Sequence, residues 1–113
     1  MSDLTVSRES LKRVDLVVAD GRIDSSTAPQ FDAVLKECLA DGNTNIVVNL
    51  SGVSYMSSAG LRALISALRE AKGKGGRIAI AAPSERVSEV LELAGVATLF
   101  DIYDDQTSAV GSF

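Results

Sequence analysis

The stretch NIVVNLSGVSYMSSAGL, residues 45–61, decides the fold of this chain. The mostly apolar run from Ile46 to Leu50 is typical of a strand that is covered on both faces. A short loop follows, and then a helix whose apolar side chains recur at helical spacing, at Leu61, Leu64, Ile65 and Leu68. This order of strand, loop and helix places Ser57 and Ser58 at the start of the helix, where unpaired backbone N–H groups favour a phosphate.

Strand and helix patterns alternate through the rest of the chain. Residues 4–6 and 14–18 are expected to form a pair of strands that ends at Gly21, and residues 78–82 a buried strand. A helix is expected to begin at the hydroxyl of Thr27, because Pro29 follows it at an early helical position.

The last third of the chain contains one more helix and a less regular end. The helix is expected after Ser84, with Val87, Val90, Leu91 and Ala94 facing inward. Residues 99–103 suit a short last strand, and residues 104–113 a tail or a weak helix.

These patterns together predict a single α/β domain over residues 1–113, with a mixed sheet of four to five strands packed with about four helices. In such sheets, functional groups collect at the carboxyl ends of strands and at the helix starts that follow them. Ser57 and Ser58 lie at such an end.

Composition excludes several kinds of function. The net charge of −4 without clustered Lys and Arg argues against nucleic-acid binding. The absence of histidine and the presence of a single cysteine, Cys38, exclude an intramolecular disulfide and the usual zinc, haem and iron–sulfur ligand sets, so we expect no metal and no cofactor. No segment is long and apolar enough for membrane insertion, and we expect a cytoplasmic protein.

The serine pair has a structural and a functional interpretation. A serine before an apolar-periodic helix is most often an N-cap, which contributes about 1 kcal/mol. Two hydroxyls where one cap suffices, beside the small pair Ala59–Gly60, leave room for a function. An enzyme is not expected, because there is no histidine base and no Gly-x-Ser-x-Gly elbow. The glycine-rich turn from Gly73 to Gly76 follows a helix and lacks the order of a P-loop.

Residues 46–64, above all VSYMSSAGLRAL from Val53 to Leu64, closely resemble the signature of anti-sigma factor antagonists, whose fold is called the STAS domain. The resemblance covers nearly the whole chain. It extends to GRID at residues 21–24 with Thr27–Pro29, to GGR at residues 75–77 and to LELAGV at residues 91–96.

By this resemblance, Ser58 matches the serine that an anti-sigma factor kinase phosphorylates. Ser57 replaces the aspartate that usually precedes this serine, and is a competing acceptor. Asp24 matches an acidic position near the switch serine, and Arg22 replaces a residue that is commonly acidic. The partner-binding residues are therefore expected to be Asp24, Met56, Ser57, Ser58, Ala59, Gly60 and Arg62.

The function that the resemblance implies is partner switching. The unphosphorylated protein would bind an anti-sigma factor that is also a serine kinase, of the ATP-binding histidine-kinase-like fold, and release the client of that kinase. Phosphorylation of Ser58 would reverse the binding, and a metal-dependent serine phosphatase would restore it. A monomer is compatible with this acidic, aliphatic chain.

Two alternatives remain open at this level. The chain could be a fixed STAS-like subunit of a lipid-transport ATPase complex, in which the two serines only cap the helix. It could also be a sensor of a nucleotide or another small molecule, which the turn from Gly73 to Gly76 suggests only weakly. Binding of a transporter subunit in the first case, and thermal stabilisation by nucleotide in the second, would distinguish them from a phosphorylated switch.

Overall fold

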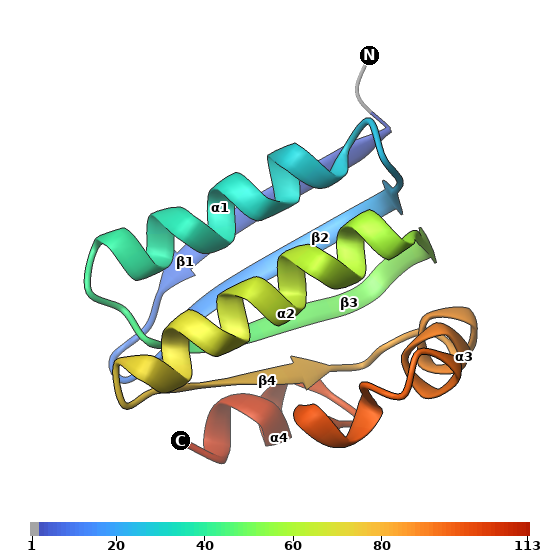
Figure 1. The fold of residues 1–113 in the computed structure, drawn as a ribbon. Helices are drawn as coiled ribbons and strands as arrows, with labels where there is room; N and C mark the ends of the chain where they lie inside the picture. Colours follow the sequence, from blue (N-terminus) through green and yellow to red (C-terminus); the bar gives the residue numbers. More distant parts are fainter. Residues whose placement is uncertain (1–2) are drawn as a thin grey trace.

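The computed structural model describes residues 3–113. These residues form a five-stranded mixed sheet, four α-helices and one 3₁₀ helix (Figure 1). The strands lie in the order β1-β2-β3-β4-β5; β1 is antiparallel to β2, and the other neighbours are parallel. The elements are β1 (Leu4–Ser10), β2 (Asp15–Ile23), α1 (Ala28–Ala40), β3 (Asn45–Met56), α2 (Ser58–Gly73), β4 (Arg77–Ala81), α3 (Glu85–Leu93), η1 (Ala97–Leu99), β5 (Asp101–Tyr103) and α4 (Gln106–Gly111). The predicted α/β class is confirmed.

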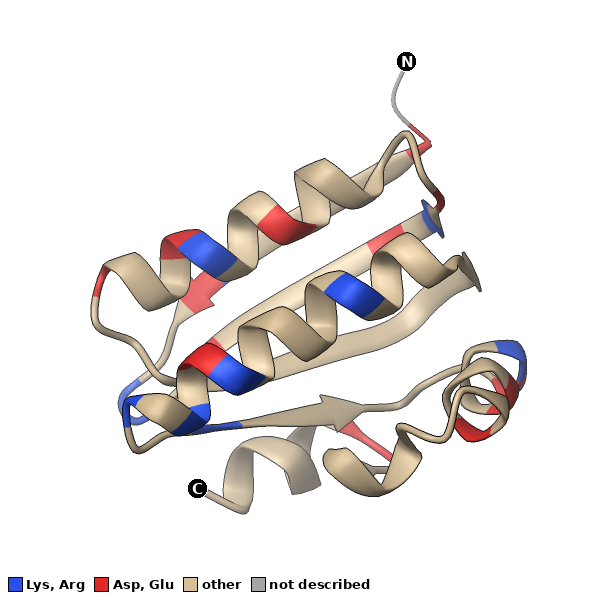
Figure 2. Cartoon of the chain, in the orientation of Figure 1, with Lys and Arg blue, Asp and Glu red and all other residues tan. Residues whose placement is uncertain are grey.

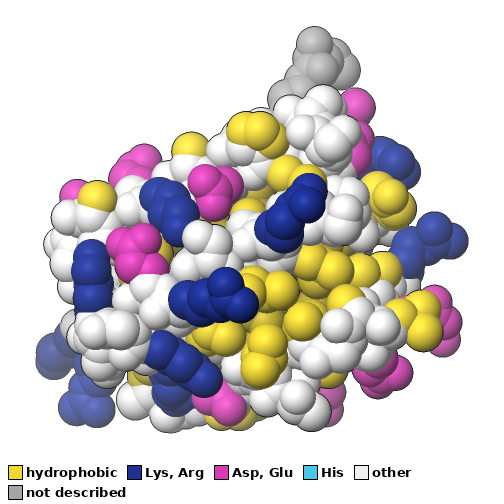
Figure 3. Space-filling view, in the orientation of Figure 1, with side chains coloured by type: hydrophobic (Ala, Val, Ile, Leu, Met, Phe, Trp, Pro, Cys, Tyr) yellow, Lys and Arg dark blue, Asp and Glu magenta, His cyan; other side chains and the backbone are white. Residues whose placement is uncertain are grey.

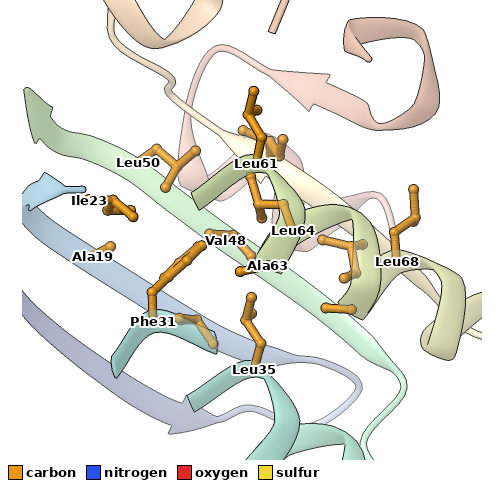
Figure 4. Packing of buried hydrophobic residues seen from close by; sticks show 14 of the residues in the cluster. Ala19, Ile23, Phe31, Leu35, Val48, Leu50, Leu61, Ala63, Leu64 and Leu68 are labelled. Carbon is orange, nitrogen blue, oxygen red and sulfur yellow. The ribbon is translucent and has the colours of Figure 1, made fainter. Parts of the chain in front are cut away.

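The sheet separates two apolar cores. Ile78 and Ile80 of β4 belong to a large core with α1, α2 and α3, whereas Ala79 and Ala81 belong to a smaller core with Ala109 of α4. Alternate residues of a strand point to opposite faces, so α4 covers the face opposite α1 and α2. Figure 4 shows Phe31 of α1 reaching toward Val48 of β3 in the large core.

The central strand is longer than the sequence predicts. The expectation of a short loop directly after Leu50 is wrong, because β3 continues to Met56 beside the end of β2. Two register shifts in the β2–β3 pairing accommodate this polar segment, and Ile23 pairs with Met56 at its end. The longer strand brings the start of α2 directly to the carboxyl end of the sheet.

Three smaller expectations need correction. Thr27 stands at the N-cap position of α1, but its hydroxyl donates to the Arg22 carbonyl, 2.8 Å away, and caps nothing. Ala94 is exposed, because α3 ends at Leu93 and the helical spacing stops there. The last strand begins only at Asp101, after a 3₁₀ turn over residues 97–99. Of the two alternatives for residues 104–113, the short helix is the one observed.

An ion-pair network ties β1, β2 and α1 together at the amino end of β2. Arg8 contacts the carboxylate of the buried Asp15 at 2.8 Å, and also pairs with Glu37 and Asp41 of the α1 end. Asp15 accepts two further hydrogen bonds, from the Ser10 hydroxyl at 3.0 Å and from Asn43 at 2.9 Å. The buried charge is therefore both paired and fully hydrogen-bonded, as a carboxylate in a protein interior must be.

Candidate functional site

The candidate site lies where β2 and β3 end and α2 begins. The backbone N–H of Ser57 donates to the Ile23 carbonyl at 2.8 Å, which joins the two strand ends. Ser57 has an extended backbone, and α2 begins at the next residue. The two serines are thus held on the rigid end of the sheet.

The hydroxyl of Ser57 is used as the helix cap. It accepts from the backbone N–H of Gly60 at 3.4 Å, while the Ser57 carbonyl accepts from the N–H of Leu61 at 3.1 Å. This is the arrangement of an N-cap, in which a side-chain oxygen satisfies an otherwise unpaired donor of the first turn.

Ser58 is placed differently. It is exposed at the first position of α2, and its hydroxyl makes no hydrogen bond within the part of the chain that the structure describes. The backbone N–H groups of Ser58 and Ala59 likewise have no acceptor among residues 3–113. A group attached to the Ser58 hydroxyl would therefore meet solvent, two free donors and the positive end of a helix of 16 residues.

Gly60 allows α2 to start this close to the strands. A Cβ atom at this position would lie 2.7 Å from Cγ2 of Ile23 and 3.0 Å from Cγ of Met56. Met56 is only 2% exposed and Gly60 is buried. These two predicted partner-binding residues therefore do not lie on the surface; they fix the position of the serine pair from beneath.

We expect Gly60→Ala to lower the free energy of unfolding by about 2 kcal/mol, because the new methyl group overpacks two buried side chains. Gly73→Ala is the matched control, since Gly73 ends the same helix and a Cβ there meets nothing within 4 Å. It should be neutral or stabilising by up to about 1 kcal/mol. Urea unfolding measures both changes. Equal stability of the two variants would show that the contact at Gly60 costs nothing.

Asp24 organises the loop between β2 and α1. Its Oδ1 accepts from the Ser26 hydroxyl at 2.7 Å, the Ser26 N–H at 3.0 Å and the Thr27 N–H at 3.1 Å. These hydrogen bonds, the one from the Ser26 side chain above all, lower the pKa of Asp24 and keep it ionised. Its observed contacts are those of a turn carboxylate, at a half-exposed position from which a partner could also reach it.

Arg22, by contrast, lies over an aromatic ring. Its guanidinium stands 4.6 Å from the centroid of Tyr55, the residue it opposes on β3. Such stacking is a cation–π contact. The Arg22 side chain is thus held on the sheet surface, and it brings a positive charge close to the end of β3.

Ala59 and Arg62 line an open groove between α1 and α2, with a volume of about 410 Å³. Opposite them, the α1 side of the groove is formed by Ala28, Pro29 and Asp32. Arg62 is exposed and makes no ion pair or hydrogen bond with any described residue. The two helices run along the same face of the sheet, which is why their side chains meet there (Figure 1).

The face that carries α2 combines basic and apolar surface. Basic side chains follow α2, and an apolar area lies between this helix and the α3 region (Figure 3). Leu93 on α3 is 88% exposed, a feature that the helical spacing did not predict. A contiguous exposed apolar area with polar residues around it is common where proteins bind one another.

The single thiol lies away from the site. Cys38 is buried on α1, and burial raises its pKa to about 12. A thiol in this state is not a nucleophile at neutral pH. None of the described helices is long and apolar enough to cross a membrane.

Comparison with known proteins gives a consistent picture. The STAS domain family model matches residues 6–109. An anti-sigma-B factor antagonist of Staphylococcus aureus is 31% identical over 86 residues, which are 76% of this chain and 80% of that protein. The crystal structure of an anti-sigma factor antagonist from Mycobacterium paratuberculosis superposes with a TM-score of 0.88 at 25% identity, and covers 96% of this chain and 92% of its own.

The same fold occurs in SpoIIAA, whose structure is known in two states. The unphosphorylated form has a TM-score of 0.82 at 21% identity, and the match covers 94% of this chain and 93% of SpoIIAA. The phosphorylated form has a TM-score of 0.77 at 21% identity, and the match covers 96% of this chain and 98% of SpoIIAA. These two structures show the likeness of the fold alone. The family match over most of the chain and the sequence relative from Staphylococcus establish that this chain belongs to the STAS domain family of anti-sigma factor antagonists.

Proposed function

We propose that this protein is an anti-sigma factor antagonist that works by partner switching, with Ser58 as the phosphorylated residue. The observation that carries the proposal is that the two serine hydroxyls differ in their hydrogen bonding. Ser57 caps α2 with its hydroxyl, whereas the hydroxyl of Ser58 is exposed and has no partner among the described residues. Ser57 thus takes over the capping that an aspartate can provide, and Ser58 remains free to react.

The phosphorylation step needs a second protein. The γ-phosphoryl group of ATP would pass to Oγ of Ser58, with release of ADP and of the hydroxyl proton. No base contacts Ser58 within the described chain, so the kinase must supply the groups that position ATP and accept the proton. We infer an anti-sigma factor of the ATP-binding histidine-kinase-like fold as this partner, acting in the cytoplasm, and a metal-dependent serine phosphatase for the return step.

The modification would act on binding and leave the fold in place. A phosphoserine carries about −1.5 to −2 charges, which the N-terminus of α2 tolerates. The same charge opposes a partner that must remove water from Ser58 and its apolar surroundings. Two relatives fit this mechanism: one is named an anti-sigma-B factor antagonist, and SpoIIAA, which shares the fold, is known in a phosphorylated form.

The assignment of Ser58 can be tested by phosphoryl transfer. Labelled ATP and the anti-sigma kinases encoded in the same genome are incubated with the wild type, Ser58→Ala and Ser57→Asp. The wild type and Ser57→Asp should be labelled, because an aspartate keeps the cap but offers no hydroxyl. Ser58→Ala should lose the label. Undiminished labelling of Ser58→Ala would overturn the assignment, and the absence of transfer from every kinase would favour a fixed subunit in which both serines only begin the helix.

A further inference from the structure

Arg62 lies one helical turn after Ser58 on the same face of α2. Residues four apart on a helix are neighbours, with Cβ atoms about 5–6 Å apart. Helical side chains also lean toward the N-terminus of the helix, and the side chain of Arg62 is long enough to reach a group at Ser58 from its place at the groove between α1 and α2. The spacing therefore places a guanidinium within reach of any group attached to the Ser58 hydroxyl.

Among residues 3–113, this arginine has no anionic partner. Arg8, Arg77, Lys36 and Lys74 each form an ion pair with a nearby carboxylate, whereas Arg62, like the other Lys and Arg side chains, forms none with the described residues. Asp32 of α1 lines the same groove but forms no ion pair with Arg62. The α2 helix carries its basic residues on the outer side, where Figure 2 shows them at intervals along the ribbon.

We propose that Arg62 binds the phosphate of phosphorylated Ser58 within the same helix, so that the modification adds negative charge and withdraws a free cation from the partner-binding surface. This inference rests on the proposed function, because it needs a phosphate at Ser58. Guanidinium and phosphate form strong, often bidentate hydrogen bonds. The free N–H groups of Ser58 and Ala59 add donors on the helix side.

The consequence is a switch that affects two positions at once. In the unmodified protein, Arg62 is available to a carboxylate or a carbonyl of the partner. In the phosphorylated protein, it is engaged with its own helix. The phosphate is thereby held against α2, and we expect the first turn to become more stable, not to unfold.

The experiment uses full-length protein in which phosphoserine is incorporated at position 58 during translation. Its phosphorus resonance is titrated with pH in the wild type, in Arg62→Gln and in Arg69→Gln. Arg62 favours the doubly charged phosphate, so its removal should raise the phosphate pKa by about 0.2 to 0.4. Arg69 is exposed on the same helix, seven residues further on, and its removal should change the pKa by less than about 0.1.

A second signal reports on the arginine itself. The side-chain Nε–Hε resonance of Arg62 should shift and sharpen when position 58 is phosphorylated, while that of Arg69 should stay in place. Equal phosphate pKa values in all three proteins, with an unchanged Arg62 resonance, would overturn the proposal.

The design separates this inference from the proposed function, because encoded phosphoserine requires no kinase. If no kinase modifies Ser58 but the titration depends on Arg62, the ion pair stands and the proposed function fails. If kinases modify Ser58 but the phosphate pKa is the same with and without Arg62, the proposed function stands and the ion pair is ruled out.

Discussion

Phosphorylation of Ser58 is expected to weaken the complex with the anti-sigma partner about a hundredfold, which corresponds to a loss of roughly 3 kcal/mol. In the proposed mechanism, the partner covers the exposed position at the start of α2, where a dianion would have to lose its water against apolar surface. Calorimetric titration of the kinase with the unmodified and the phosphorylated protein, at one fixed salt concentration, measures the change.

A phosphoserine at Ser7 provides the control for charge alone. Ser7 is exposed on β1, and it follows Val6, which packs against the large core, so its side chain lies on the face opposite α1 and α2. Phosphate at Ser7 should change the affinity less than about twofold. If the two phosphoproteins bind equally well, the start of α2 is not the surface that the partner recognises.

Arg8→Met is expected to lower the free energy of unfolding by about 3 kcal/mol. Asp15 has a side chain only 3% exposed, and Arg8 is its sole ion-pair partner among residues 3–113. Removing one member of a buried pair leaves an uncompensated charge, which typically costs about 3–5 kcal/mol. The hydrogen bonds from Ser10 and Asn43 remain, so we expect the lower end of that range.

Glu37→Gln tests the exposed side of the same network. Glu37 also pairs with Arg8, but its side chain is 65% exposed, and exposed pairs contribute about 0–1 kcal/mol. Chemical unfolding of both variants should therefore separate them by 2 kcal/mol or more. A loss of the same size in both would mean that Asp15 is not the charge that makes Arg8 necessary.

The alternation of apolar periods predicted the order of the elements well. The strand over 46–50 and the apolar stripe of α2 follow directly from spacing. The extension of β3 to Met56 was missed, because SGVSY is polar and carries a glycine. Only the pairing with the end of β2, with its two register shifts, makes that segment a strand.

The place of the serine pair at the start of α2 was predicted from the sequence, but its hydrogen bonding was not. The sequence places two hydroxyls at a helix start, and cannot say which of them caps the helix, because both have the same side chain. That choice depends on backbone geometry: Ser57 is extended and its hydroxyl reaches the N–H of Gly60, while Ser58 is already helical and its hydroxyl bonds to no described residue. Met56 and Gly60 belong to the same sequence motif as the serines. Their burial, however, depends on their proximity to Ile23, which is distant in the sequence.

The most direct test of a switch at Ser58 is the intact mass of the protein purified from its own host, before and after phosphatase treatment, with fragmentation to locate the modification. We expect a population that carries one phosphate on Ser58 and loses it on treatment. A protein that remains unmodified under every growth condition, or that carries its phosphate elsewhere, would contradict the account.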